Sequence, residues 1–368
     1  NLGAAHLMLG NRRRHVEYTR TSAELFAARG ENERAATLQA NAGATLIDFG
    51  DDPVQGFRLV QNALTVFREA RNTTGEVFAL QVSAAYHRYR GEHAEAERLL
   101  QQALAISRQY GLKQRLWSLE LDRLRSLYEI GEYETVRQRL MRDLPLAAGR
   151  DRAQGEILLA LTETRLGDFE GARKRLVSVA AAAGANDETL HLLLAAARGE
   201  LAYEANISAE ARRWFDEAAA RWTQEPPHAR AVEALAYRGL LDGLRGDLGR
   251  AERALRQSLD RARLLGRLGL ETRCRVFLAR LAVERGRFDE AVRVLAEVPP
   301  DDAARTVGPE LRAFVHYWRG RALAGLGDVK SRQELSAARR LVEDLRERLP
   351  DHGRKAFTAR PDLRRILG

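Results

Sequence analysis

Apolar residues recur along this chain at helical spacing, in runs of about 18 residues separated by a short turn motif. The motif is a glycine, an acidic or small residue, a residue that is often aromatic or aliphatic, and usually an alanine. Clear copies lie at 91–96, 131–136, 167–172, 246–251 and 286–291. Glycine ends a helix in a left-handed conformation that costs other residues about 1 kcal/mol. An acidic residue then favours the start of the next helix. Each copy therefore predicts a helix–turn–helix hairpin.

The turn residues repeat every 36 to 41 residues, at Gly10, Gly50, Gly91, Gly131, Gly167, Asn206, Gly246, Gly286 and Gly327. A fixed period of this size is typical of stacked supersecondary units. The predicted helices are 12–29, 31–49, 53–70, 73–90, 93–110, 112–130, 133–144, 150–166, 169–183, 187–204, 208–223, 228–245, 248–265, 267–285, 288–297, 307–326 and 329–348. Pro53 falls at a predicted helix start and no proline interrupts a predicted helix interior, where it would cost about 3 kcal/mol.

This pattern resembles the tetratricopeptide repeat. The resemblance rests on the turn motif and on small residues midway along the first helix of a pair, at Gly199, Gly239 and Gly320. Second helices carry matching alanine and leucine positions. The period is longer than the usual one of about 34 residues, and is similar to that of the solenoids in bacterial multidomain regulators. The resemblance implies an all-α, right-handed superhelical solenoid of about nine repeats, with first helices on the concave face and a role in binding proteins or peptides.

The repeats define the expected domain plan. We expect residues 1–349 to form one solenoid that begins in the middle of a repeat, so that the natural protein extends upstream. Residues 350–368 are a basic amphipathic segment that caps the last repeat or acts as a linker. In that segment Phe357, Leu363, Ile366 and Leu367 are placed to cover the last helix face.

The composition excludes some classes of protein but does not identify the function. Hydrophobic residues make up 45% of the chain and charged residues 30%, which suits a folded protein with solvated helix faces. No apolar run is long enough to span a membrane, and the single Cys274 excludes an internal disulfide framework. The localisation that we expect is cytoplasmic. The net charge of +9 permits nucleic-acid binding, but we favour arginine–glutamate pairing on helix surfaces and expect no nucleic-acid partner.

The chain contains no catalytic motif. There is no His-Glu-x-x-His, no phosphate-binding loop and no nucleophile elbow. Cys274 lies between Arg273 and Arg275, which could lower the pKa of its thiol, although a packed structural thiol is the favoured interpretation. We therefore predict neither an enzymatic activity, nor a metal, nor a cofactor.

The remaining candidate site is the concave face of the first helices. With the turns in register, this face receives aromatic residues beside arginines, the types that concentrate binding energy in interfaces. The predicted partner-binding residues are Phe78, Gln81, Arg88, Tyr89, Glu200, Tyr203, Tyr317 and Arg321. The expected occupant is a protein or peptide segment.

Three functions are compatible with this reading. The favoured one is a regulatory scaffold or sensor within a larger bacterial signalling or defence protein, with a fused or associated effector domain. The second is a segment of an enzyme whose catalytic domain, such as a caspase-like CHAT peptidase, a Ser/Thr kinase or a nucleotide-binding switch ATPase, lies outside this chain. The third is a nucleic-acid-binding solenoid.

Overall fold

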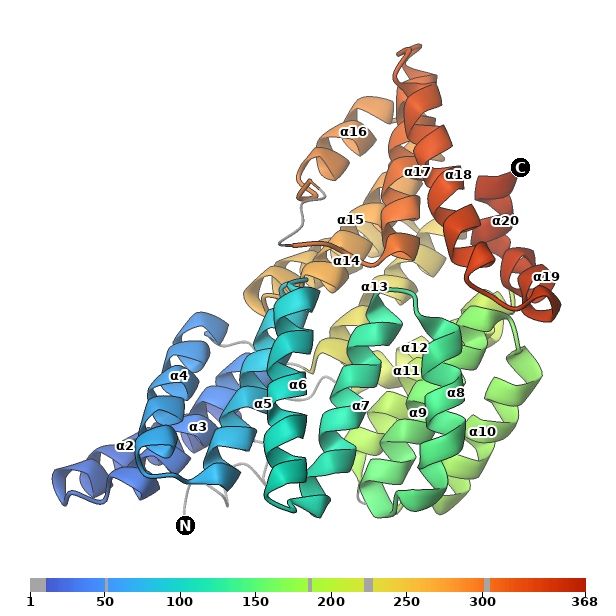
Figure 1. Cartoon of the computed structure of the whole chain (residues 1–368). Helices are drawn as coiled ribbons and strands as arrows, with labels where there is room; N and C mark the ends of the chain where they lie inside the picture. Colours follow the sequence, from blue (N-terminus) through green and yellow to red (C-terminus); the bar gives the residue numbers. More distant parts are fainter. Residues whose placement is uncertain (1–10, 50–51, 185–186, 222–227, 301–304) are drawn as a thin grey trace. The chain divides into compact units, whose positions relative to one another are not determined.

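The computed structural model describes residues 11–49, 52–184, 187–221, 228–300 and 305–368, which contain helices and turns and no strand (Figure 1). These residues form two compact units. Unit 1 runs to Ser126 and includes 262–267, and unit 2 consists mainly of 127–221, 230–261 and 268–368. The expectation of one continuous solenoid over 1–349 stays a prediction.

Unit 1 is built from consecutive antiparallel helices. They are α2 (Arg12–Ala28), α3 (Asn32–Phe49), α4 (Pro53–Glu69), α5 (Thr73–Tyr89), α6 (His93–Gln109) and most of α7 (Lys113–Glu129). Their core consists of small and branched apolar residues from both helices of each pair, such as Ala63, Leu80, Ala96 and Leu100.

Unit 2 continues the same alternation. Its helices are α8 (Tyr133–Asp143), α9 (Gly149–Leu166), α10 (Phe169–Ala182), α11 (Glu188–Glu204), α12 (Ser208–Ala220), α13 (Ala229–Leu244), α14 (Leu248–Leu264), α15 (Leu268–Val283), α16 (Phe288–Ala296), α17 (Pro309–Gly325), α18 (Ser331–Glu347), α19 (Asp351–Ala359) and α20 (Pro361–Leu367). A single 3₁₀ turn, Leu144–Leu146, follows the short α8. The predicted helices are present, and most of their ends agree with the prediction to within two residues.

The predicted turn residues adopt the left-handed conformation. Positive φ angles occur at Gly91, Gly131, Gly167, Asn206, Gly246, Gly286 and Gly327, while Gly10 and Gly50 lie outside the described residues. The acidic residue of the motif caps the next helix where it is aspartate: Asp168 Oδ1 accepts a hydrogen bond from the amide of Gly171 at 3.0 Å. Glu92 and Glu132 make no such bond.

The small residues predicted at helix crossings lie where two helices touch. A β-carbon added at Gly199 would be 2.5 Å from the Phe215 ring, and one at Gly320 would be 2.8 Å from Leu335. At Gly239 the nearest atoms would be 3.1 Å away. These glycines allow the first helix of each pair to approach its second helix.

The two ends of unit 2 meet each other. The turn at Gly131 packs against Leu345 of α18, and the turn at Gly167 packs against Ala356 of α19. Arg348 also forms an ion pair with Glu132 at 3.0 Å. Unit 2 is therefore closed on itself, with its last hairpin against its first.

The C-terminal segment lies against this closure. Helix α20 packs on α18 (Figure 1), and α19 contacts α9. Phe357, Leu363 and Ile366 are buried and Leu367 is half-buried. Three of its four apolar side chains are thus buried, and the role of the segment as a cap or a linker stays a prediction.

The crossing at Gly199 gives a test of this packing. Replacing Gly199 with alanine should lower the free energy of unfolding by roughly 1–3 kcal/mol, because the added methyl group overlaps the Phe215 ring. Gly269 is also helical, yet nothing lies within 4 Å of an added β-carbon, so Gly269→Ala should be neutral or slightly stabilising. Urea unfolding of both variants measures the difference; equal effects would refute the close crossing.

Candidate functional site

Five charged side chains are buried together inside unit 2, and we call them the central ionic cluster: Arg165, Glu200, Glu204, Glu310 and Arg360. They come from α9, α11 and α17 and from the junction between α19 and α20. Each side chain is less than a tenth exposed, and Arg360 is only 1% exposed. Charges buried to this degree are tolerated only when they are paired and hydrogen-bonded.

The two arginines of the cluster share its carboxylates. Arg360 donates from both terminal nitrogens to the carboxylate of Glu310, at 2.9 and 2.7 Å, and from Nε to Glu204 at 3.0 Å. It also donates to the backbone carbonyl of Arg165 at 2.9 Å. Arg165 in turn donates to Glu204 at 2.6 Å, to Glu200 at 2.9 Å and to Glu310 at 3.2 Å. Planar guanidinium groups suit such bidentate contacts.

A second set of polar contacts extends the cluster along the first helices. Arg230 bridges Glu200 and Glu233, at 2.8 Å to each. Glu233 also pairs with Arg273 at 3.2 Å, and Arg273 donates to the hydroxyl of Tyr237 at 2.7 Å. The first helices α11, α13 and α15 are thus joined by side chains about one repeat apart in sequence.

A third set surrounds Asp362, near the start of α20. Tyr203 donates its hydroxyl to Asp362 at 2.7 Å, and Arg280 reaches both the Tyr203 hydroxyl at 2.9 Å and Asp362 at 3.2 Å. Trp318 lies beside Arg280, with its ring centre 5.5 Å from the guanidinium carbon. The pocket lined by these residues has a free volume of only about 20 Å³, which is room for about one water molecule.

The electrostatics of the cluster follow from burial and from the neighbouring charges. Burial alone would raise the pKa of Glu310, but the charges of Arg360 and Arg165 lower it to about 2. Burial, and next the charge of Glu233, raise the pKa of Glu200. The pKa values of two carboxylates in one interior are therefore shifted in opposite directions, because burial dominates at Glu200 and the two arginines dominate at Glu310.

The four predicted site residues of unit 1 lie near one another on α5. Gln81 donates to Asp122 at 2.7 Å, and Tyr89 donates its hydroxyl to Asp48 at 3.1 Å. Arg88 lies over the Tyr89 ring, 4.6 Å from its centre. Phe78 is half-buried and packs against the core of unit 1. Each polar side chain of this group reaches an acidic residue or an aromatic ring.

The four predicted site residues of unit 2 differ in exposure. Glu200 belongs to the central ionic cluster, and Tyr203 is half-buried in contact with Asp362. Tyr317 is buried and accepts a hydrogen bond from Arg321 at 3.0 Å. Of these four only Arg321 is exposed. Partner binding by these residues stays a proposal.

Sequence reasoning missed Arg165, Arg280, Glu310, Arg360 and Asp362 as parts of one site. One signal was available: Arg165 and Glu204 each lie two residues before a turn residue, so they occupy equivalent positions in successive repeats. Opposite charges at equivalent positions of neighbouring repeats can meet directly. The other partners come from distant parts of the chain, which the repeat period does not predict.

Among the described residues, no group of three or more His, Cys, Asp or Glu could hold a metal ion. Cys274 is buried, and burial raises the pKa of its thiol, so the nucleophilic thiolate is disfavoured. No helix in the described ranges combines the length and apolar character needed to cross a bilayer.

No family model matches the chain, and no curated protein matches it. Among solved structures it is similar to a Rap protein complexed with Competence and Sporulation Factor, with a TM-score of 0.54 and 16% identity over 96% of this chain and 97% of that one. It is also similar to the apo form of the quorum sensor NprR from B. thuringiensis, with a TM-score of 0.51 and 13% identity over 92% and 96%. This likeness concerns the fold, and the predicted all-helical repeat fold is confirmed.

The pairing within the central ionic cluster makes a stability prediction. Arg165→Met should lower the free energy of unfolding by about 3–5 kcal/mol, because Glu200 and Glu204 would lose a buried countercharge. The matched control is Arg173→Met: Arg173 is 46% exposed and 3.4 Å from Glu210, and its loss should cost less than about 1 kcal/mol. Similar costs in urea unfolding would contradict a structural role for the buried pairs.

The lowered pKa of Glu310 predicts a pH dependence. In the unfolded chain the carboxyl takes up a proton near its ordinary value of 4.5, and in the folded chain only near 2. Its contribution to stability is therefore fully present above pH 4.5 and is lost as the pH falls toward 2. The difference in Tm between wild type and Glu310→Gln should shrink over that range. A difference independent of pH would show that the carboxylate is not held ionised.

Proposed function

We propose that this chain, which has the fold of long tetratricopeptide-like repeats, is a non-catalytic module that binds a protein or peptide segment on the inner faces of its first helices. We call inner face the side of each first helix that carries the central ionic cluster in unit 2, or the hydrogen bonds of Gln81 and Tyr89 in unit 1. The proposal covers the inner-face residues of both units.

The observation that carries this proposal is the chemistry of the inner faces. They present arginine, glutamate and tyrosine side chains that hold one another in place, as Arg165 holds Glu200 and Arg273 holds Tyr237. Apolar side chains fill the space between first and second helices, as Phe215 of α12 does beside Tyr237 of α13. Side chains that are already ordered lose little conformational entropy when a partner binds, and arginine and tyrosine are enriched in binding hot spots.

The proposed contacts in unit 1 are Phe78, Gln81, Arg88 and Tyr89. Tyr89 and Gln81 are half-buried, so part of each side chain remains accessible. Their present partners, Asp48 and Asp122, supply acceptors to which donors of a bound segment could also bond. In unit 2 the proposed contacts are Glu200, Tyr203, Tyr317 and Arg321.

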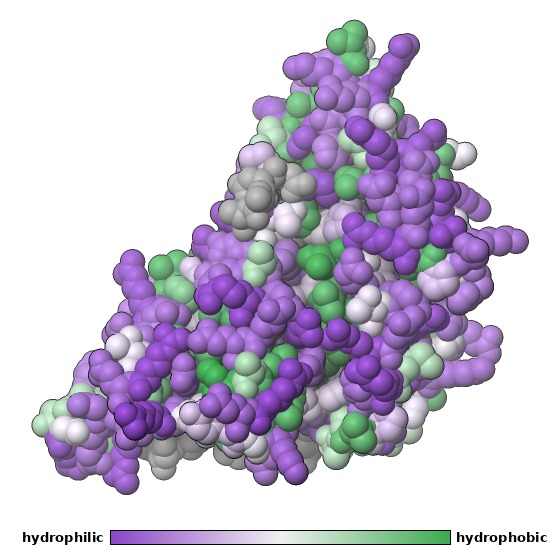
Figure 2. All heavy atoms as spheres, in the orientation of Figure 1, coloured by the Kyte–Doolittle hydropathy of each residue, from purple (hydrophilic) through white to green (hydrophobic). Residues whose placement is uncertain are grey.

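The surface favours polar recognition over a broad apolar contact. The face shown in Figure 2 is mainly hydrophilic, with hydrophobic residues in separate patches. Many surface arginines are paired, for example Arg98 with Glu95 and Arg123 with Glu97. Such pairing reduces the free positive charge that nucleic-acid binding would use.

The two similar structures support a regulatory setting. One is complexed with Competence and Sporulation Factor and the other is a quorum sensor. We extend the proposal accordingly: the chain is the sensing or scaffold part of a bacterial signalling or defence protein, acts in the cytoplasm, and works with a fused or associated effector domain. Residues 1–349 would form the binding array and 350–368 its C-terminal cap.

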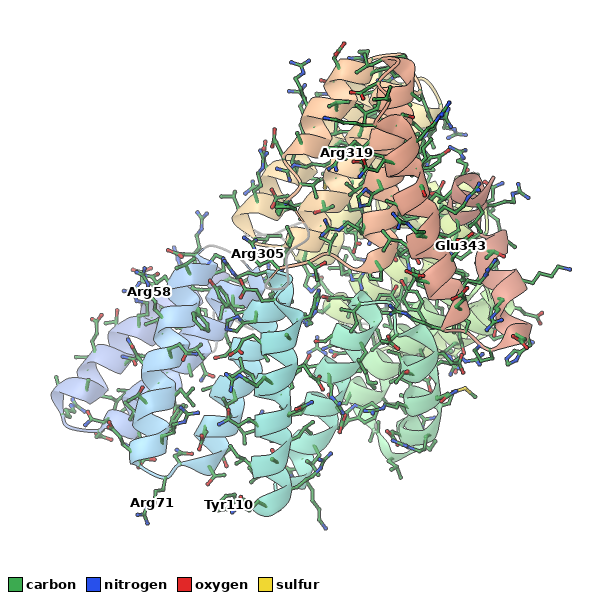
Figure 3. The ribbon with its side chains drawn as sticks, turned by 45° about the horizontal axis from the view of Figure 1, so that its top comes forward. Arg58, Arg71, Tyr110, Arg305, Arg319 and Glu343 are labelled. Carbon is green, nitrogen blue, oxygen red and sulfur yellow. The ribbon has the colours of Figure 1, made fainter. Side chains whose placement is uncertain are left out.

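The test is selection of binders with the full chain. A phage-displayed library of random peptides is panned against it, and the enriched peptides are measured by fluorescence anisotropy. We expect Tyr89→Ala to weaken binding about tenfold or more, as a hot-spot truncation does. The control is Tyr110→Ala: Tyr110 is 59% exposed and lies at the turn after α6 (Figure 3), so its loss should change affinity little.

Salt dependence separates peptide binding from nucleic-acid binding. Peptide affinity should fall only weakly with salt, whereas affinity for a single-stranded oligonucleotide would fall steeply as counterions are released. Failure to enrich any peptide sensitive to Tyr89→Ala, together with steep salt-dependent binding of the oligonucleotide, would overturn the proposal.

A further inference from the structure

We call three consecutive residues of the C-terminal segment, Arg360, Pro361 and Asp362, the tail triplet; the side chains of Arg360 and Asp362 reach partners inside unit 2. Arg360 joins α19 to α20, which begins with Pro361 and Asp362, and the backbone at Arg360 is non-helical, with φ −57° and ψ 133°. This geometry sends the Arg360 side chain to the central ionic cluster and leaves Asp362 beside Arg280.

The repeats provide a matched set of partners for each charge of the triplet. The guanidinium of Arg360 meets the carboxylates of Glu204 and Glu310 and one backbone carbonyl. The carboxylate of Asp362 meets the hydroxyl of Tyr203 and the guanidinium of Arg280. These partners all belong to the first helices α9, α11, α15 and α17.

The pocket beside Asp362 has no room for a further side chain while the triplet is in place. The pocket that Asp362 helps to line has about 20 Å³ of free space, and Arg360 is 1% exposed. An external arginine or carboxylate could reach the same partners only if the triplet left. The triplet and a second ligand of the same chemistry therefore cannot occupy the site at the same time.

We infer that the interior of unit 2 is a recognition site for an Arg-x-Asp sequence, that the chain's own residues 360–362 occupy it, and that a partner segment carrying the same sequence displaces them. The inference rests on the proposed function, because it assigns a ligand chemistry to the inner face of unit 2. A ligand on the same chain competes at an effective concentration near the millimolar range. Removing its charges should therefore open the site to an external peptide.

The experiment uses the full chain and a fluorescent peptide with the sequence of residues 351–368. We expect the peptide to bind the double variant Arg360→Ala, Asp362→Ala at least about tenfold more tightly than wild type, since the internal competitor is weakened. It should also raise the Tm of that variant. A peptide with Arg360→Ala should lose this binding, while the control peptide with Arg364→Ala should keep it, because Arg364 is exposed on α20.

A second measurement avoids the risk that the double variant does not fold. A protease site is inserted between Pro350 and Asp351, where the Asp351 side chain is 91% exposed, and the chain is cut after folding. The severed segment should stay bound and be released by excess peptide 351–368, but not by the peptide with Arg360→Ala. A severed segment that resists exchange until the protein unfolds, or equal competition by both peptides, would overturn the inference.

The outcomes distinguish this inference from the proposed function. Library peptides that depend on Tyr89 would support the proposed function even if the tail triplet never exchanges. Exchange of the triplet without any library binder would support the recognition chemistry of unit 2 and count against a general peptide-binding role.

Discussion

The arrangement of the helices in unit 2 depends on the buried ion pairs of the central ionic cluster. Arg165 and Arg360 face Glu200, Glu204 and Glu310 at hydrogen-bonding distance, with little room for water. Removing either arginine takes a buried countercharge from two or three carboxylates, which is far more costly than a small change in apolar packing. Because these residues come from α9, α11, α17 and the tail triplet, the pairing fixes how these elements are positioned against one another within the unit.

The fold could be predicted because its signals are local. Gly91, Gly167 and Asn206 adopt positive φ at the positions that the turn motif marks, and each helix between turns carries its own apolar spacing. The prediction did not extend to Arg71, which adopts a positive φ of 55° between α4 and α5 and projects from that turn (Figure 3). Arginine, unlike glycine or asparagine, does not by its type indicate a positive φ angle. Only the period of about 40 residues therefore predicts a turn at this position.

The site could be predicted only in part, and the limit is sequence separation. Glu200 and Tyr203 were placed on the inner face because they share the turn register of other first helices. The partner of Tyr203 in the tail triplet could not be inferred, since Asp362 lies 159 residues further along the chain. A repeat period specifies which positions of neighbouring repeats meet. It does not specify where the array closes, and so gave no indication that an arginine from outside the repeats would fill the interior.

The polarity of that interior is itself an argument about function. Apolar residues of similar volume often stabilise a protein as well as a buried ion pair does, or better, so stability alone does not require arginine and glutamate here. An ionic interior has a property that an apolar one lacks: it discriminates between ligands by charge and by the spacing of charges. The spacing in unit 2 matches Arg360 and Asp362, two residues apart on one segment. Any other segment with an arginine and an aspartate at that spacing would present the same groups to Glu204, Glu310 and Arg280.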